Sequence, residues 1–250
     1  MNRQYHKWHS PNLDREMELL VFGDSGTRVI VFPTSCGRFY DWENREMIET
    51  LKPQIDQGKL QVFCVDSVDA ESWWNTDASP SEKAARHLAY HQYVIDEVLP
   101  FSEKMNDNDF VIALGASMGG YHAINLTLRF PEKFDRCVAM SGPYDFVQMS
   151  APYNVFSWSH NCDDSDVLKC NPVPLLKTLS QAHLDKLKKV EIIFPIGQTD
   201  PLYDSNVMLA QELTEKNVPH SFYTWDGFAH DWPFWKDMML HYVNGDAARK

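Results

Sequence analysis

Ser117 lies in the segment Gly115-Ala116-Ser117-Met118-Gly119-Gly120, directly after the apolar run from Phe110 to Leu114. A Gly-x-Ser-x-Gly sequence between a strand and a helix is typical of a sharp turn that exposes a serine hydroxyl at the carboxyl end of the strand. The three fixed letters occur by chance in about one chain in twelve of this length. The strand and helix patterns on either side therefore carry the prediction that Ser117 is a nucleophile.

A serine hydroxyl becomes a good nucleophile only when a base removes its proton and an acid holds that base in the correct tautomer. In chains with this turn, the acid and the histidine come later, each in a loop after a strand. Asp200 follows the apolar run Val190 to Ile196, and His230 follows the run His220 to Trp225. We therefore predict Ser117, Asp200 and His230 as a catalytic triad.

The oxyanion that forms during acyl transfer needs backbone N–H donors, each worth roughly 3 to 4 kcal/mol of transition-state stabilisation. The N–H of Met118, directly after the serine, is the first candidate. The second donor is expected from the loop at residues 33–38, which follows an apolar strand-like run. We predict the backbone N–H of Cys36 for this role, with Ser35 and Gly37 as alternatives.

The elements that must position these residues alternate between strand and helix from residue 28 onward. Strand-like runs lie at 17–22, 28–32, 60–65, 110–114, 136–140, 190–196 and 220–225. Helical patterns lie at 42–51, 82–105 with a kink at Pro100, 118–130, 205–216 and 232–242. The alternation predicts an α/β fold: a doubly wound, mostly parallel sheet with helices on both faces, and one or two antiparallel strands at an edge. We expect a single domain over residues 1–250.

Residues 143–174 interrupt this alternation and are rich in Pro, Asn, Ser, Asp and aromatic residues. Long irregular insertions are often lids or binding loops. The alternative is a surface loop whose aromatic side chains pack back onto the body. Trp158 in this insertion, together with Trp73 and Trp74, is a candidate for lining an acyl or aromatic pocket, and packing in the core is the alternative for these residues.

Composition excludes some function classes. The formal net charge is −12, with no cluster of basic residues, which argues against a nucleic-acid partner. The chain has no apolar window long enough to span a bilayer and no secretion signal, so we expect a cytoplasmic protein.

Five cysteines without metal-like spacing indicate reduced thiols, and Cys162 and Cys170 would pair only in an oxidising compartment.

His87 and His91 are four residues apart on a predicted helix, which is a metal-ligand spacing. The intervening residues, Leu88-Ala89-Tyr90, lack the glutamate of a His-Glu-x-x-His site. We therefore interpret the pair as part of a solvated face, and predict neither a metal nor a cofactor.

The segment 115–120, the acid Asp200 after its strand and the sequence His230-Asp231-Trp232 together resemble the α/β-hydrolase superfamily. Over roughly residues 15–243 the chain is similar to the esterase family that includes S-formylglutathione hydrolase (esterase D), enterochelin and feruloyl esterases, and the mycolyltransferases. The resemblance implies a serine esterase acting on a small-molecule ester. It also implies the same triad, with Met118 and Cys36 as oxyanion donors.

Two other functions remain open at this point. An acyltransferase would use the same triad and differ only in the nucleophile that reaches the acyl-enzyme. A non-catalytic binding module on the same fold is possible because fold does not determine function, although the complete triad favours an enzyme. Formation of a homo-oligomer is also left open.

Overall fold

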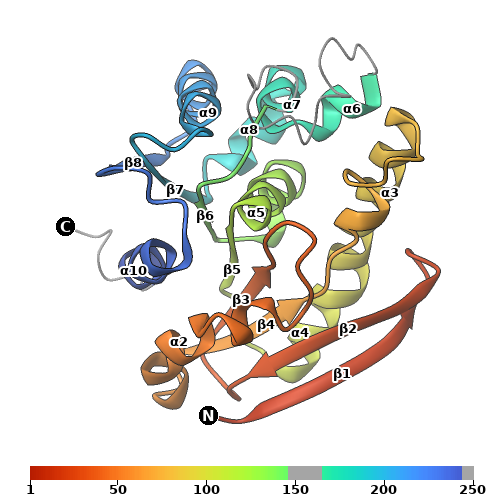
Figure 1. Ribbon diagram of the computed structural model, residues 1–250, viewed down its shortest axis with the longest axis vertical. Helices are drawn as coiled ribbons and strands as arrows, with labels where there is room; N and C mark the ends of the chain where they lie inside the picture. Colours follow the sequence, from red (N-terminus) through yellow and green to blue (C-terminus); the bar gives the residue numbers. More distant parts are fainter. Residues whose placement is uncertain (146–164, 244–250) are drawn as a thin grey trace.

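The computed structural model describes residues 1–145 and 165–243, and within them the strands form one eight-stranded sheet (Figure 1). The sheet order is β1-β2-β4-β3-β5-β6-β7-β8. The pairs β1–β2 and β2–β4 are antiparallel, and the remaining pairs are parallel. The strands are β1 (Arg3–Ser10), β2 (Arg15–Phe22), β3 (Thr27–Phe32), β4 (Leu60–Val65), β5 (Val111–Ala116), β6 (Arg136–Met140), β7 (Glu191–Gly197) and β8 (Ser221–Trp225). This arrangement confirms the predicted α/β fold.

Helices cover both faces of the sheet (Figure 1). They are α1 (Asp41–Asn44), α2 (Met47–Asp56), α3 (Pro80–Tyr93), α4 (Leu99–Met105), α5 (Met118–Arg129), α6 (Ser165–Cys170), α7 (Pro172–Thr178), α8 (Gln181–Leu187), α9 (Tyr203–Glu215) and α10 (Trp232–Val243). None of the helices in the described ranges combines the length and apolarity that a membrane span requires.

The two faces of the sheet hold separate apolar cores because successive strand residues point to opposite sides. In β5, Ala113 packs into the core under α3, α4, α5, α7, α8 and α9. Its neighbours Ile112 and Leu114 pack into the core under α1, α2 and α10. The central strands are therefore apolar at nearly every position, as expected for a sheet that is buried on both sides.

Several elements differ from the sequence prediction. The strand β1 was not predicted, and the helix expected at 42–51 is split into α1 and α2 at Glu46, whose φ of 60° lies in the left-handed region. The kink expected at Pro100 is a turn of π-helix at Val94–Val98, which joins α3 to α4. Proline lacks an N–H and clashes with the carbonyl four residues earlier, and a wider turn relieves both problems.

The insertion at 143–174 is not irregular throughout. Its last part forms α6 and the start of α7, two short helices that pack against each other. Residues 146–164, including Trp158 and Cys162, lie outside the described residues. The predicted lid therefore falls largely outside them as well.

Candidate active site

Ser117 lies between the end of β5 and the first residue of α5, with φ 54° and ψ −122°. The chain turns so sharply there that a Cβ atom on Gly115 would lie 2.2 Å from the backbone of Gly119. A Cβ atom on Gly119 would lie 2.4 Å from the carbonyl oxygen of Phe32 in β3. Only glycine fits at these two positions. Because these residues have no side chain, the helix can start directly after the serine.

His230 and Asp200 lie beside this serine. The Nε2 atom of His230 lies 3.2 Å from Ser117 Oγ, and its Nδ1 atom lies 2.7 Å from Asp200 Oδ2. A carboxylate only accepts hydrogen bonds, so Nδ1 carries the proton and Nε2 presents its lone pair to the serine hydroxyl. The structure thus brings together three residues that are separated by up to 113 positions in the sequence.

Asp200 is fixed by its surroundings. Its side chain is fully buried, whereas 21% of the His230 side chain is exposed. The second carboxylate oxygen, Oδ1, accepts the N–H of Leu202 at 2.9 Å. The two loops are also joined by their backbones, since the N–H of Thr199 donates to the carbonyl of Gly227 at 2.9 Å. The acid and the histidine therefore form one connected unit at the ends of β7 and β8.

Aromatic packing holds the imidazole ring. The ring of Trp235 meets that of His230 edge to face, with 5.0 Å between centroids. The indole N–H of Trp235 donates to Ser141 Oγ at 3.3 Å, just beyond the end of β6. A ring held by packing and by a carboxylate keeps its orientation toward the serine without reorganisation.

The loop at residues 33–38 starts against α5, since a Cβ atom on Gly119 would lie 2.8 Å from the carbonyl oxygen of Pro33. The N–H of Thr34 donates to Asp41 Oδ2 at 3.0 Å, and the N–H of Gly37 donates to the carbonyl of Thr34 at 2.8 Å. The N–H of Cys36 donates to Asp69 Oδ2 at 3.1 Å. The prediction for Cys36 therefore needs correction, because a carboxylate already occupies the N–H that was assigned to the oxyanion. Of the three candidates in the loop, Ser35 alone makes no N–H hydrogen bond within the described residues.

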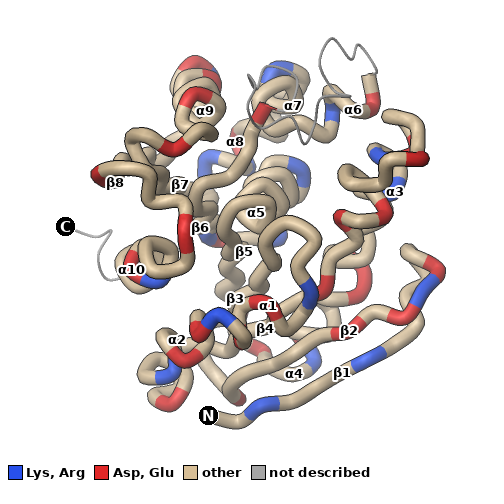
Figure 2. Tube along the Cα trace, in the orientation of Figure 1, with Lys and Arg blue, Asp and Glu red and all other residues tan. Residues whose placement is uncertain are grey.

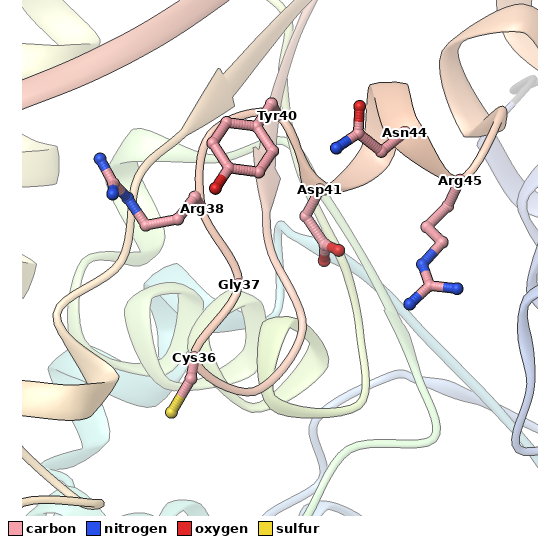
Figure 3. A pocket seen from close by; sticks show the side chains of 7 residues that line it. All are labelled: Cys36, Gly37, Arg38, Tyr40, Asp41, Asn44 and Arg45. Atoms are coloured by element: carbon pink, nitrogen blue, oxygen red, sulfur yellow. The ribbon is translucent and has the colours of Figure 1, made fainter.

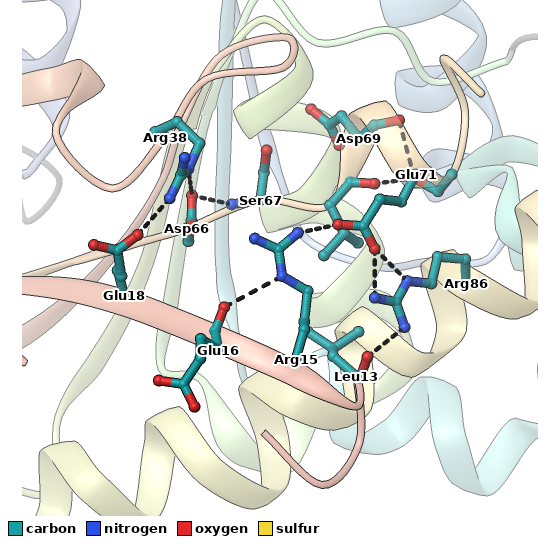
Figure 4. A network of polar contacts seen from close by, with 12 residues as sticks. Leu13, Arg15, Glu16, Glu18, Arg38, Asp66, Ser67, Asp69, Glu71 and Arg86 are labelled. Atoms are coloured by element: carbon teal, nitrogen blue, oxygen red, sulfur yellow. Dashed lines mark hydrogen bonds and ion pairs between the residues drawn. The ribbon is translucent and has the colours of Figure 1, made fainter. Parts of the chain in front are cut away.

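Arg38 anchors this loop to the sheet (Figure 4). Its guanidinium donates to Glu18 on β2 and to Asp66 after β4, at 2.6 Å in each case. Burial raises the pKa of the Asp66 carboxyl, and the Arg38 cation opposes that effect. Beside them, Glu71 bridges Arg15 and Arg86. The two ion pairs of Arg38 fix the loop relative to β2 and to the end of β4.

A pocket of about 440 Å³ opens beside the loop (Figure 3). It is lined by Cys36, Gly37, Arg38, Tyr40, Asp41, Asn44 and Arg45. The Arg45 guanidinium lies 5.3 Å from the ring centroid of Trp232, which is two residues after His230. Arg45 therefore connects the pocket to the segment that carries His230. The pocket was not predicted from the sequence, because its lining comes from α1 and from a loop that reads as polar surface.

The tryptophans predicted to line a pocket have different positions. Trp73 is 1% exposed and packs with Met118 and Tyr121, directly behind the serine. Trp74 is half-buried against the same cluster. Trp158 lies outside the described residues. Trp73 therefore occupies a core position next to Met118, in line with the packing alternative.

The sequence interpretation of His87 and His91 as a solvated face is wrong. Both side chains are buried, at 0% and 1% exposure, and they lie against a third buried histidine, His122 on α5. Burial, and then repulsion from neighbouring positive charge, lowers the pKa of both His87 and His91 well below the usual value. The helix α6 packs against α3, which contributes to this burial.

Among the described residues, Cys36, Cys64 and Cys137 are free thiols. Cys64, Cys137 and Cys170 are buried, whereas Cys36 is exposed. Desolvation and the nearby Asp69 carboxylate raise the pKa of the Cys36 thiol to about 11. Cys36 is therefore a thiol at neutral pH and lacks the electropositive surroundings of a reactive cysteine.

A comparison with protein families places most of this chain in a known group. The family described as "Putative esterase" matches residues 43–243, a range that holds Ser117, Asp200 and His230 but not the loop at 33–38. The chain belongs to this esterase family. The esterase is thus an ester-hydrolysing enzyme, and the family resemblance seen in the sequence is confirmed.

Solved structures show the same fold. A ferulic acid esterase superposes with a TM-score of 0.73 at 17% identity, over 97% of this esterase and 96% of that chain. An S-formylglutathione hydrolase from Agrobacterium tumefaciens gives 0.72 at 15% identity, over 96% and 92%. The S-formylglutathione hydrolase FrmB from Staphylococcus aureus gives 0.68 at 19% identity, over 95% of each chain. No curated protein sequence is significantly similar to this esterase.

Proposed function

We propose that this esterase hydrolyses carboxylic esters of small acyl or aromatic groups through an acyl-enzyme on Ser117. The observation that carries the proposal is the continuous hydrogen-bonded path from Asp200 through His230 to Ser117 Oγ, with distances of 2.7 and 3.2 Å. This is the geometry that activates a serine for attack on a carbonyl carbon.

In the first half-reaction, Ser117 Oγ attacks the acyl carbonyl carbon while His230 Nε2 takes its proton. The carboxylate of Asp200 stabilises the imidazolium that results. When the tetrahedral intermediate collapses, His230 returns the proton to the departing alcohol oxygen and the acyl group remains on Ser117. Water then repeats the same steps, with His230 as base, and releases the carboxylic acid.

The oxyanion of the intermediate is stabilised by two backbone N–H groups in this proposal. Met118 is the first residue of α5, where N–H groups have no intrahelical partner and the helix dipole favours negative charge. The second donor is Ser35. The other two candidates in its loop, Cys36 and Gly37, already donate to Asp69 Oδ2 and to the carbonyl of Thr34.

The pocket beside the loop takes part of the ester. A volume of about 440 Å³ fits a single ring or a short chain. Arg45 lines the pocket and has no carboxylate partner among the residues described here, although its guanidinium contacts the ring of Trp232. Its cation is therefore available to polar groups of a ligand. Positive and negative positions are interspersed along the described trace without a basic stripe (Figure 2), which supports a small-molecule substrate over a polyanion.

Hydrolysis of p-nitrophenyl esters from acetate to octanoate tests the proposal, with the parent, Ser117→Ala and Ser25→Ala compared at neutral pH. We expect Ser117→Ala to lower kcat by roughly 10⁴-fold or more. Ser25 is exposed in the turn before β3, so its variant should keep the parent rate. A burst of one p-nitrophenol per chain would reveal the acyl-enzyme.

Two outcomes would contradict the proposal. Equal rates in the parent and Ser117→Ala would remove Ser117 as nucleophile. Release of the acyl group mainly as an ester of an added alcohol, in dilute alcohol, would identify an acyltransferase instead of a hydrolase.

A further inference from the structure

Three buried histidines gather behind the helix that carries the serine. His87 and His91 are one turn apart on α3, and His122 lies on α5. One nitrogen from each ring lies within 4.8 Å of a nitrogen from each of the other two rings. The exposed fractions of His87, His91 and His122 are 0%, 1% and 1%. Three imidazoles that converge in a water-excluded place are an unusual arrangement for purely structural packing.

Two of the three rings have a defined tautomer. The Tyr121 hydroxyl donates its single proton to the carbonyl of Cys170 at 2.8 Å, so at 3.1 Å it accepts from His87 Nε2. The carboxylate of Asp69 accepts from His122 Nε2 at 2.9 Å. When Nε2 carries the proton of a neutral ring, Nδ1 carries a lone pair. In their neutral forms, His87 and His122 therefore each hold an Nδ1 lone pair.

These lone pairs have no hydrogen-bond donor. Within the described residues, His87 Nδ1, His122 Nδ1 and both nitrogens of His91 are buried without a partner. Buried polar atoms are nearly always paired in proteins, because an unpaired one costs its full desolvation energy.

We propose that His87, His91 and His122 bind a divalent transition-metal ion of the Zn²⁺ class. His87 and His122 bind through Nδ1, and a water molecule completes the tetrahedron. Imidazole nitrogen is a preferred ligand for Zn²⁺, and histidines at i and i+4 on a helix point to the same side. At a Zn–N distance of about 2.0 to 2.1 Å the nitrogens of a tetrahedral site are roughly 3.3 Å apart. The nitrogens need to approach one another by up to about 1.5 Å, through rotation of the side chains.

The surroundings match those of metal-bound histidines. Such histidines donate their other N–H to a carboxylate or another acceptor, which fixes the ring and raises its basicity. Asp69 does this for His122, and Tyr121 does it for His87. The Asp69 carboxylate also offsets part of the charge of the ion and of Arg129, whose cation contributes to the low pKa of His91.

The same carboxylate links the cluster to the loop beside Ser117. Asp69 Oδ1 accepts from His122, and its Oδ2 accepts from the N–H of Cys36. An ion bound to His122 fixes the Nε2–H tautomer that Asp69 requires, and so holds this loop in place. The ion has a structural role in this proposal, which does not depend on the ester reaction.

Zinc binding by the full chain tests the site, with any affinity tag removed. The protein is stripped with a chelator, then loaded with Zn²⁺ either when folded or during refolding from urea, because the cluster is buried. Bound zinc is counted by mass spectrometry after gel filtration, and the Tm is measured with and without the metal. We expect one Zn²⁺ per chain and a Tm increase of roughly 5 °C or more.

Two variants locate the ion. His91→Leu removes two unpartnered nitrogens and fills the space with apolar atoms, so the stripped variant should melt no lower than the stripped parent while binding no zinc. The exposed His9→Gln serves as the matched control and should bind one Zn²⁺. X-ray absorption of the zinc-loaded parent gives a further readout that needs no variant, with a first shell of nitrogen and oxygen that contains imidazole.

Three results would overturn the proposal: no zinc retained by the parent under either loading condition, equal zinc retained by His91→Leu, or a first shell that lacks imidazole. None of these readouts involves esterase activity. The metal site and the proposed ester hydrolysis can therefore fail independently.

Discussion

Gly197 at the end of β7 packs against the backbone of Phe228 so closely that a Cβ atom on Gly197 would lie 2.1 Å from the Phe228 carbonyl oxygen. Phe228 is two residues before His230, in the loop after β8. The strand that leads to Asp200 thus touches the loop that carries His230. The close approach of β7 to this loop is possible because residue 197 is a glycine and has no side chain.

Gly197→Ala should therefore push the 226–230 loop away from β7 and move His230 from Ser117. We expect overpacking to lower the free energy of unfolding by about 1 to 3 kcal/mol. We also expect kcat to fall roughly 10²-fold. Urea unfolding and p-nitrophenyl acetate kinetics measure the two effects. Gly227→Ala is the contrast, because its φ of 74° strains an alanine while no atom lies within 4 Å of the new Cβ. A larger loss of kcat in Gly227→Ala would contradict the steric explanation.

Asp200→Asn keeps the shape of the acid and its acceptor for the N–H of Leu202. The amide can donate to His230 Nδ1 and so favours the wrong tautomer, with the Nε2 proton facing Ser117. We expect kcat to fall roughly 10³- to 10⁴-fold near pH 7. Asp204→Asn, at an exposed position in the first turn of α9, should leave kcat unchanged. A fall of less than tenfold in Asp200→Asn would argue that Asp200 does not orient the base.

Ser35→Pro removes the N–H that we assign to the oxyanion. Ser35 is the second residue of the turn closed by the hydrogen bond from Gly37 to Thr34, a position where proline is favoured. We expect kcat to fall roughly 10²- to 10³-fold with the fold retained, as judged by circular dichroism. Cys36→Ala keeps the backbone N–H and should retain the parent rate. If Ser35→Pro were as active as the parent, the second donor would have to lie elsewhere.

The Cys36 thiol should react slowly with alkylating reagents despite its exposure. With its pKa raised to about 11, only about one thiol in a thousand is ionised at pH 8. Its alkylation by iodoacetamide, followed by mass spectrometry of the Cys36 peptide, should accelerate about tenfold per pH unit up to pH 10. Asp69→Asn removes the negative charge that contributes to the shift, so this variant should react faster at each pH. A rate that levels off below pH 9 would show an ordinary thiol.

The sequence was sufficient to predict the central part of this fold. The apolar runs that became β3 to β7 are buried on both faces, so their composition leaves few alternatives to a parallel sheet. The glycines around Ser117 point to the turn because no other residue fits there. The juxtaposition of Asp200 and His230 with Ser117 followed from the order of the strands.

Other features depend on tertiary contacts that the local pattern does not contain. The strand β1 has exposed and half-buried residues in alternation, and its charged and aromatic composition gives no apolar run to detect. The polar helix pattern around His87 and His91 suggested a surface, but α6 packs against α3 there. The Cys36 N–H was assigned from its place in the loop, and the distant carboxylate of Asp69 could not be anticipated. In each case the structure at one position depends on contacts with residues far away in the sequence.

The position of β8 as the last strand and an edge strand has a consequence for synthesis and turnover. Among the described strands β8 pairs with β7 alone, and it must dock before His230 can reach Ser117. In the proposed mechanism, a nascent chain that has completed β5 and α5 already carries the nucleophile, yet it has no base to activate it. A chain whose final strand has detached returns to that state. The mechanism thus confines reactivity toward esters to molecules that have finished assembling their sheet.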